Sequence, residues 1–153
     1  MPKSIIKILA TFFSVGYFPI APGTLASLVT LVLAWFLLPQ ETIINLFVCL
    51  AIILVAVWSG TKAEEFWGED NRRIVIDEVA GMLVSIFLVS RSIRLYLAAF
   101  LLFRFFDVLK PFPIRKLEKL KSGWGVTTDD IAAGVYANIT LLLLLYLRNI
   151  LKT

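Results

Sequence analysis

The chain has 153 residues, of which 59% are hydrophobic and only 17% are charged, and its mean hydropathy is +0.89. Soluble domains are about half apolar and about one quarter charged, so the composition argues against a soluble protein and favours one that faces lipid. The net charge of +4 favours an anionic membrane surface over nucleic acid, for which no basic stripe with interleaved aromatic residues is present. At this length we expect one membrane-embedded domain over residues 1–153.

Six apolar stretches divide the chain, and their lengths are typical of helices rather than strands. Only the third and the last approach the roughly 20 residues that cross a bilayer comfortably, so some of the others should be interfacial, re-entrant or buried. The sequence therefore predicts an all-α, polytopic membrane bundle of about five to six helices. The stretches are Ile5–Phe18, Thr24–Leu38, Thr42–Gly60, Val79–Ser90, Leu95–Phe106 and Ile131–Leu151.

The polar segments between these stretches fall on one side of the predicted bundle. If successive stretches cross the membrane as hairpins, then Gly16–Gly23, Thr61–Asp77 and Lys110–Asp130 all lie at the same face. Basic residues are more frequent at this face than at the other, so the positive-inside rule predicts that it is cytoplasmic. The first face carries Lys62, Arg72, Arg73, Lys110, Arg115, Lys116, Lys119 and Lys121, and the second carries Arg91, Arg94, Arg148 and Lys152.

The first polar motif is Pro22-Gly-Thr-Leu-Ala-Ser27. Gly23 permits another group to approach the backbone closely, and Thr24 to Ser27 can begin a helix whose free N–H groups attract phosphate. The alternative is that the motif only caps the helix, with Thr24 as the N-cap residue. The motif by itself leaves both interpretations open.

The second motif, Asp77-Glu-Val-Ala-Gly81, stands at the start of the fourth apolar stretch. Acidic residues in a first helical turn interact favourably with the helix dipole, which is one explanation for the pair. Two adjacent carboxylates that enter a membrane segment are nevertheless costly unless they are paired, solvated or bound to metal. Gly81 lies on the same helix face as Asp77, where its small size would let another helix approach.

The third motif is Arg104-Phe-Phe-Asp-Val-Leu-Lys-Pro-Phe-Pro113. Arg104, Asp107 and Lys110 are spaced i, i+3 and i+6, so they follow one ridge of a helix. An aspartate in the last turn of a helix opposes the helix dipole, so capping gives Asp107 no favourable role. Pro111 disfavours helical backbone at the residue before it, and we expect Lys110 to leave the helix in an extended turn.

A fourth polar segment, Thr127-Thr-Asp-Asp130, comes before the last apolar stretch. Asp129 and Asp130 can cap the last helix, because acidic residues are favourable in a first turn. Asp130, Gly134 and Asn138, however, form a stripe of polar and small residues at i, i+4 and i+8 in an otherwise apolar helix. Such a stripe should face the protein interior rather than lipid.

Together the motifs bring five carboxylates to one face of the predicted bundle. The basic residues Arg104 and Lys110 lie at the same face. Carboxylate oxygens suit Mg²⁺, which binds them together with water and substrate phosphate, and the basic residues suit an anionic substrate. The chain contains no histidine, and its single cysteine, Cys49, is not followed by an arginine six positions later. These absences exclude histidine-dependent phosphatases, conventional zinc hydrolases and cysteine-based phosphatase loops. The five carboxylates are those of Asp77, Glu78, Asp107, Asp129 and Asp130.

Four segments resemble the motifs of the phosphatidylglycerophosphatase A family in order and spacing. They cover most of the chain between Tyr17 and Asn138, and the Arg-Phe-Phe-Asp…Lys-Pro-Phe-Pro block is the most specific of them. Trp124 departs from the family pattern, which has a small residue there. The segments are Pro22–Ser27, Ile76–Gly81, Phe103–Ile114 and Gly123–Gly134.

The resemblance implies an all-helical enzyme of the bacterial inner membrane that depends on Mg²⁺ and hydrolyses the phosphomonoester of phosphatidylglycerophosphate. The products are phosphatidylglycerol and inorganic phosphate, and the reaction is a step of phospholipid biosynthesis. On this hypothesis the five carboxylates are the metal-binding candidates, and some of them hold one or two Mg²⁺ ions. Within each adjacent pair, one acid binds metal while the other supports it or acts as a base. The catalytic candidates are Asp107, Asp130, Glu78, Lys110 and Arg104, and the phosphate-binding candidates are Gly23, Thr24, Ser27, Arg104 and Lys110.

Two other classes of protein also carry acids in a helical bundle. A small ion or proton transporter would hold them near the middle of the membrane, whereas these lie at the ends of segments on one face. A membrane scaffold whose acids only cap helices would give Asp107 no role. The sequence leaves open whether water attacks phosphorus directly or a covalent aspartyl-phosphate forms, and it does not give the oligomeric state.

Overall fold

The structure is a computed structural model that describes residues 2–69, 71–117 and 123–151. In this part of the chain it contains helices, turns and loops but no strand, which confirms the prediction of an all-α fold. The elements are α1 (Lys3–Ala10), a short 3₁₀ helix η1 (Val15–Tyr17), α2 (Pro22–Leu37), α3 (Thr42–Trp67), α4 (Ile76–Ser85), α5 (Ile93–Leu109), α6 (Ile114–Leu117) and α7 (Gly123–Ile150).

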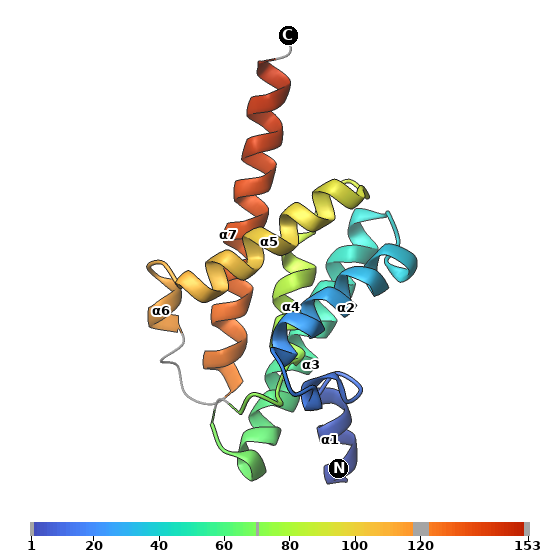
Figure 1. The fold of residues 1–153 in the computed structure, drawn as a ribbon. Coiled ribbons are helices and arrows are strands. Elements are labelled where there is room, and N and C mark those ends of the chain that lie inside the picture. The colour runs from blue at the N-terminus through green and yellow to red at the C-terminus, as the bar shows by residue number, and fades with distance from the viewer. Residues whose placement is uncertain (1, 70, 118–122, 152–153) are drawn as a thin grey trace.

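Helices α3 and α7 are, among the described residues, the two that are long and apolar enough to cross a membrane. They have 26 and 28 residues, and at about 1.5 Å per residue each exceeds the roughly 30 Å hydrocarbon core of a bilayer. Large apolar side chains are exposed along both, among them Phe47 and Leu54 of α3 and Leu143 and Leu147 of α7. Figure 1 shows the C-terminal half of α7 extending beyond the other helices. An apolar outer surface of this kind fits lipid better than water.

The ends of several helices differ from the predicted stretches. Helix α3 continues beyond Gly60 to Trp67, because the residues that follow Gly60 include strong helix formers and an ion pair between Lys62 and Glu65. Helix α7 begins at Gly123 rather than at Ile131. The short helix α6 lies within the polar segment between the fifth and sixth apolar stretches.

The first and fourth stretches are also shorter as helices than predicted. Helix α1 ends at Ala10, and the chain then turns through positive φ angles at Phe12, Phe13 and Ser14. Helix α4 ends at Ser85 rather than at residue 90. At that end the side-chain amide of Asn138 donates hydrogen bonds to the carbonyl oxygens of residues 85 and 87, which replaces the missing helical partners.

Glycine residues let α4, α5 and α7 meet at the centre of the molecule (Figure 1). A Cβ atom on Gly134 of α7 would lie 2.3 Å from the carbonyl oxygen of Gly81 in α4. A Cβ atom on Gly81 would lie 2.6 Å from the ring of Phe103 and 2.7 Å from the carbonyl oxygen of Asp130. These contacts confirm that Gly81 permits a close approach and that the polar stripe of α7 faces inward. As a result Asp77 and Asp130 lie on facing helices at the same end of the bundle.

Candidate active site

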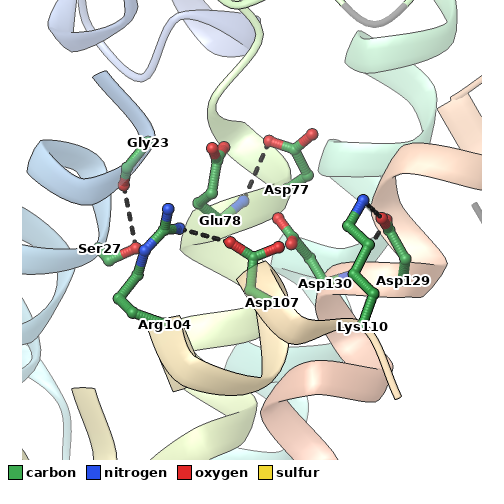
Figure 2. A network of polar contacts seen from close by, with 9 residues as sticks. All are labelled: Gly23, Ser27, Asp77, Glu78, Arg104, Asp107, Lys110, Asp129 and Asp130. Carbon is green, nitrogen blue, oxygen red and sulfur yellow. Dashed lines mark hydrogen bonds and ion pairs between the residues drawn. The ribbon is translucent and has the colours of Figure 1, made fainter. Parts of the chain in front are cut away.

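A pocket of about 370 Å³ opens where five helices bring their polar ends together. The start of α2, the end of α3 with the loop after it, the start of α4, the end of α5 and the second turn of α7 all line this pocket. All five predicted carboxylates line it, as do Arg104, Lys110, Gly23 and Thr24. Figure 2 shows the five carboxylates converging with Arg104, Lys110 and Gly23 from α2, α4, α5, α7 and the residue that follows α5. The structure therefore brings together all but one of the candidate residues predicted from the sequence.

Three of the carboxylates form a compact cluster. Asp77, Glu78 and Asp130 each offer one oxygen, and these oxygens all lie within 4.8 Å of one another. Asp77 and Asp130 are buried, with 3% and 5% of their surfaces exposed. The Oε2 atom of Glu78 is buried and makes no hydrogen bond within the part of the chain that the structure describes. An oxygen-only donor set at this spacing suits a hard divalent cation.

Burial also makes negative charge in this cluster costly in the absence of a cation. Asp77 and Glu78 lie in the first turn of α4, outside the two candidate membrane spans. Burial raises the pKa of the Asp77 carboxyl, although its oxygen accepts a hydrogen bond from the backbone N–H of Glu78 at 3.0 Å. Burial raises the pKa of Glu78 well above its ordinary value, and the neighbouring charge of Asp77 raises it further. A bound cation would relieve both effects.

The other two carboxylates each have a basic partner. Asp107 in the last turn of α5 forms an ion pair with Arg104 at 2.8 Å, and Asp129 of α7 forms one with Lys110 at 2.7 Å (Figure 2). The side chains of Arg104 and Lys110 are 22% and 24% exposed, so both basic groups keep some access to the surface. The pocket therefore contains a cluster of three acids beside two acid–base pairs.

Lys110 leaves helix α5 as predicted, but its backbone is left-handed rather than extended. Its φ angle is +44°, and its N–H donates to the carbonyl oxygen of Phe106 at 2.8 Å. A left-handed residue directly after the last helical turn is a common way for a helix to end. Pro111 then prevents further helix, and the Lys110 side chain lies in the pocket against Asp129.

Gly23 lies against Glu78 more closely than any other residue type would permit. A Cβ atom at this position would be 1.8 Å from Glu78 Oε1. The prediction that Gly23 allows a close approach is thus confirmed, but the group that approaches is a carboxylate of the same chain. Helix α2 begins at Pro22 with Ala21 as its N-cap, so the interpretation of Thr24 as the N-cap is wrong. Thr24 lies inside the first turn and lines the pocket.

Ser27 is the candidate that the structure does not bring to the pocket. Its side chain is fully buried within α2, and its hydroxyl donates to the carbonyl oxygen of Gly23 at 3.0 Å (Figure 2). This bond to the preceding helical turn is a common use of serine in apolar helices. We therefore correct the prediction: the Ser27 hydroxyl is occupied by the helix backbone.

The acidic pair on α7 does not open its helix. Because α7 begins at Gly123, Asp129 and Asp130 lie in its second turn, beyond the N-terminal positions where side chains cap a helix. Helix capping therefore does not explain Asp129 and Asp130. The structure thus argues against the alternative interpretation, that these acids only cap the last helix. Trp124, the departure from the family pattern, lies in the first turn of α7 with 58% of its surface exposed.

Four polar residues line the pocket although the sequence patterns did not indicate them as site residues. They come from the end of α3 and the loop between α3 and α4. All four residues belong to the polar segment Thr61–Asp77, which the sequence predicts to lie at the same face as the motifs. This shared face is the sequence feature that indicates them. They are Glu64, Glu69, Asn71 and Arg72.

Comparison with known proteins identifies the family. A family model described as phosphatidylglycerophosphatase A matches residues 8–145. The chain belongs to the phosphatidylglycerophosphatase A family. Membership confirms the resemblance of the four motifs and the prediction of an enzyme, since the family takes its name from a phosphatase. Together with the two candidate spans, it also supports association with a membrane.

Curated relatives match over nearly the whole chain. A Haemophilus influenzae protein named phosphatidylglycerophosphatase A is 38% identical over 92% of this chain and 89% of its own length. The Escherichia coli protein of the same name is 35% identical over 84% of this chain and 76% of its own length. A Bacteroides thetaiotaomicron protein, named as a proposed phosphatidylinositol-3-phosphatase, is 39% identical over 90% of this chain and 92% of its length. No solved structure gives a significant match.

Proposed function

We propose that this protein hydrolyses the phosphomonoester of phosphatidylglycerophosphate and releases phosphatidylglycerol and inorganic phosphate in phospholipid biosynthesis, with Mg²⁺ as its cofactor. Family membership supports the reaction class, and two relatives carry the name of this activity. The observation that carries the proposal is the pocket itself, in which Asp77, Glu78 and Asp130 meet beside Arg104 and Lys110.

The residues present fit a bound Mg²⁺ ion. Asp77, Glu78 and Asp130 would hold it, and the buried Oε2 atom of Glu78 would gain a partner that the described residues do not supply. No histidine is available as a competing ligand, and the single cysteine, Cys49, does not line the pocket. When bound, the ion would polarise the substrate phosphate and lower the pKa of a coordinated water.

Arg104 and Lys110 are the groups that would bind the phosphate oxygens. A guanidinium presents a planar pair of donors that matches phosphate, and an ammonium adds a compact positive charge. Their ion pairs with Asp107 and Asp129 fix both side chains at the pocket before the substrate arrives. Donors that are already in place stabilise the charge of the transition state without a reorganisation cost.

The start of α2 would contribute backbone donors to the same phosphate. The first N–H groups of a helix have no acceptor within it, and the helix dipole favours an anion there. Gly23 and Thr24 supply such N–H groups beside the pocket, whereas Pro22 has none. On this proposal, Asp107 and Asp129 mainly position the basic residues, and the three acids of the cluster hold the metal.

We further propose that the protein is a multi-pass protein of the bacterial inner membrane whose pocket faces the cytoplasm. The excess of basic residues on the pocket side supports this orientation. Two of those residues, Lys119 and Lys121, lie outside the described residues. Lys7 of α1 is a further basic residue on the pocket side. Its Nζ lies 5.6 Å from the ring of Phe66, near the end of α3 that we propose to be cytoplasmic.

Release of inorganic phosphate by the purified protein in detergent tests the proposal. Phosphatidylglycerophosphate is the expected substrate, and phosphatidylinositol 3-phosphate is the comparison because of the name of the Bacteroides relative. An Asp130→Asn variant, prepared in the same way and assayed at a Mg²⁺ concentration that only just saturates the wild type, controls for contaminating phosphatases. A preference for the inositol lipid would contradict the proposed substrate, and no release from either lipid would contradict the proposed activity.

A further inference from the structure

Arg72 is a basic residue of the pocket that the proposed mechanism does not use. It lies in the loop between α3 and α4, its side chain is exposed, and it lines the same pocket as the carboxylate cluster. Arg104 and Lys110 each have a carboxylate partner. Arg72 forms no ion pair or hydrogen bond through its side chain within residues 2–69, 71–117 and 123–151. Its guanidinium is therefore available to a ligand.

The surroundings of Arg72 make its charge important for an anionic ligand. Glu69 belongs to the same loop as Arg72, and both residues line the pocket together with the carboxylate cluster. An anion that extended from the cluster toward the loop would meet negative charge unless a basic group offset it. Among the pocket-lining residues of this loop and of the end of α3, Arg72 is the basic group that does so.

The residues near Arg72 are of the types that are enriched at a lipid–water interface. The guanidinium of Arg73 lies 5.7 Å from the ring of Tyr17 and 5.9 Å from the ring of Trp67. Half of the surface of Tyr17 is exposed. Tyrosine and tryptophan are enriched where lipid headgroups meet water, and basic residues there interact with lipid phosphates. The phosphodiester of a phospholipid lies at this depth.

Building on the proposed function, we propose that Arg72 binds the phosphodiester of the lipid substrate while the phosphomonoester lies against Arg104 and Lys110 beside the carboxylate cluster. A phospholipid with a phosphorylated headgroup carries both phosphates, and only the terminal one is hydrolysed. A cavity of about 370 Å³ lies within the size range of small-molecule sites and suits a headgroup that connects the two. Arg72 is then a specificity-determining residue that distinguishes such lipids from phosphatidic acid, which has a phosphomonoester but no phosphodiester.

The test compares phosphate release from phosphatidylglycerophosphate and from phosphatidic acid in mixed micelles at saturating Mg²⁺. Arg72→Gln should lower kcat/KM for the first lipid about tenfold or more, mainly through KM, as expected for loss of a charge-assisted hydrogen bond. Hydrolysis of phosphatidic acid should change less than about twofold. Arg72→Lys keeps the charge and should recover much of the loss. Arg115→Gln removes an exposed charge from α6, outside the pocket, and should leave both substrates unaffected.

Inhibition by the product gives a second measurement that does not depend on phosphatidic acid. Phosphatidylglycerol keeps the phosphodiester, so its inhibition constant should rise about tenfold in Arg72→Gln. The inference is overturned if the variant loses activity equally on both lipids, or if neither KM nor the inhibition constant changes. Failure of the proposed function looks different, because the wild-type protein would then release no phosphate from phosphatidylglycerophosphate, and the inference would fall with it.

Discussion

Replacing Gly23 by alanine tests whether the position of the Glu78 carboxylate controls catalysis. The new Cβ atom would lie 1.8 Å from Glu78 Oε1 and 2.7 Å from Glu78 Cδ. To reach an ordinary contact of 3.4 Å, the oxygen must move by about 1.6 Å, which is the difference between 3.4 Å and 1.8 Å. Because this oxygen is at the end of a flexible side chain, the Glu78 side chain should move while helix α2 stays in place.

We expect this displacement to reduce activity far more than stability. A misplacement of about 1 Å can cost about a hundredfold in rate, and a hundredfold loss corresponds to about 2.7 kcal/mol of transition-state stabilisation. Alanine is favoured over glycine inside a helix by about 0.5–1 kcal/mol, which offsets part of the cost of moving Glu78. Gly23→Ala should therefore melt near the wild-type temperature while its kcat falls about a hundredfold.

The assay measures kcat for phosphate release and the melting temperature of the wild type, Gly23→Ala, Glu78→Asp and the double variant in one detergent. Aspartate is one methylene shorter and leaves room for the added methyl group, so the double variant should be no less active than Gly23→Ala alone. The reasoning is refuted if Gly23→Ala keeps kcat within about threefold of the wild type. Losses that simply multiply in the double variant would also refute it, since the two residues would then act independently.

Three further measurements examine the carboxylates and the topology. Asp107→Asn should lower kcat about a hundredfold without raising the Mg²⁺ concentration needed for half-maximal activity, and a large rise would make Asp107 a metal ligand. In metal-free protein the raised pKa values of Asp77 and Glu78 mean that the folded state binds protons more tightly than the unfolded chain. The melting temperature should therefore increase as the pH falls from about 8 toward about 5, and a decrease would contradict this account. A cysteine at Arg115 in a Cys49→Ala background should react with an impermeant maleimide only from the cytoplasmic side, and labelling from outside intact cells would reverse the topology.

The helix faces on which the polar side chains lie were predictable because they follow from local spacing. Asp107 lies in the last turn of α5 because Pro111 limits that helix. Asp130, Gly134 and Asn138 share one face of α7 because they repeat at the helical period. Such patterns predict which face of a helix is polar. Because a polar face is costly against lipid, two polar faces in a membrane bundle should pack against each other. The convergence of the five carboxylates was predictable from the hairpin path of the apolar stretches, which brings the polar segments to one face.

The individual contacts that the site residues make were not predictable from the same patterns. That Gly23 lies against Glu78 depends on how α2 packs on α4, and local spacing carries no information about this distance. The hydroxyl of Ser27 had a partner in its own helix that competes with any ligand. The ion pair of Lys110 with Asp129 joins residues that are 19 positions apart, and it required the crossing of α5 and α7.

The ends of helices were predicted least well, because the end of an apolar stretch is not the end of a helix. Helix α3 continues through Thr61–Trp67, where Lys, Ala and Glu favour helix although they are not apolar. Helix α7 likewise begins within the polar segment before Ile131. This difference matters for the site, since the longer α3 brings Glu64 to the pocket and the longer α7 places Asp129 in a second turn.

Phosphate release from phosphatidylglycerophosphate as a function of Mg²⁺ concentration tests the central claim, that Asp77, Glu78 and Asp130 hold a divalent cation required for hydrolysis. The wild-type protein, stripped of metal, should be inactive in excess chelator and should regain full activity as Mg²⁺ saturates. Asp130→Asn should need a much higher Mg²⁺ concentration, because one of three ligand oxygens has lost its charge. Full turnover by the stripped wild-type protein in excess chelator would contradict the claim.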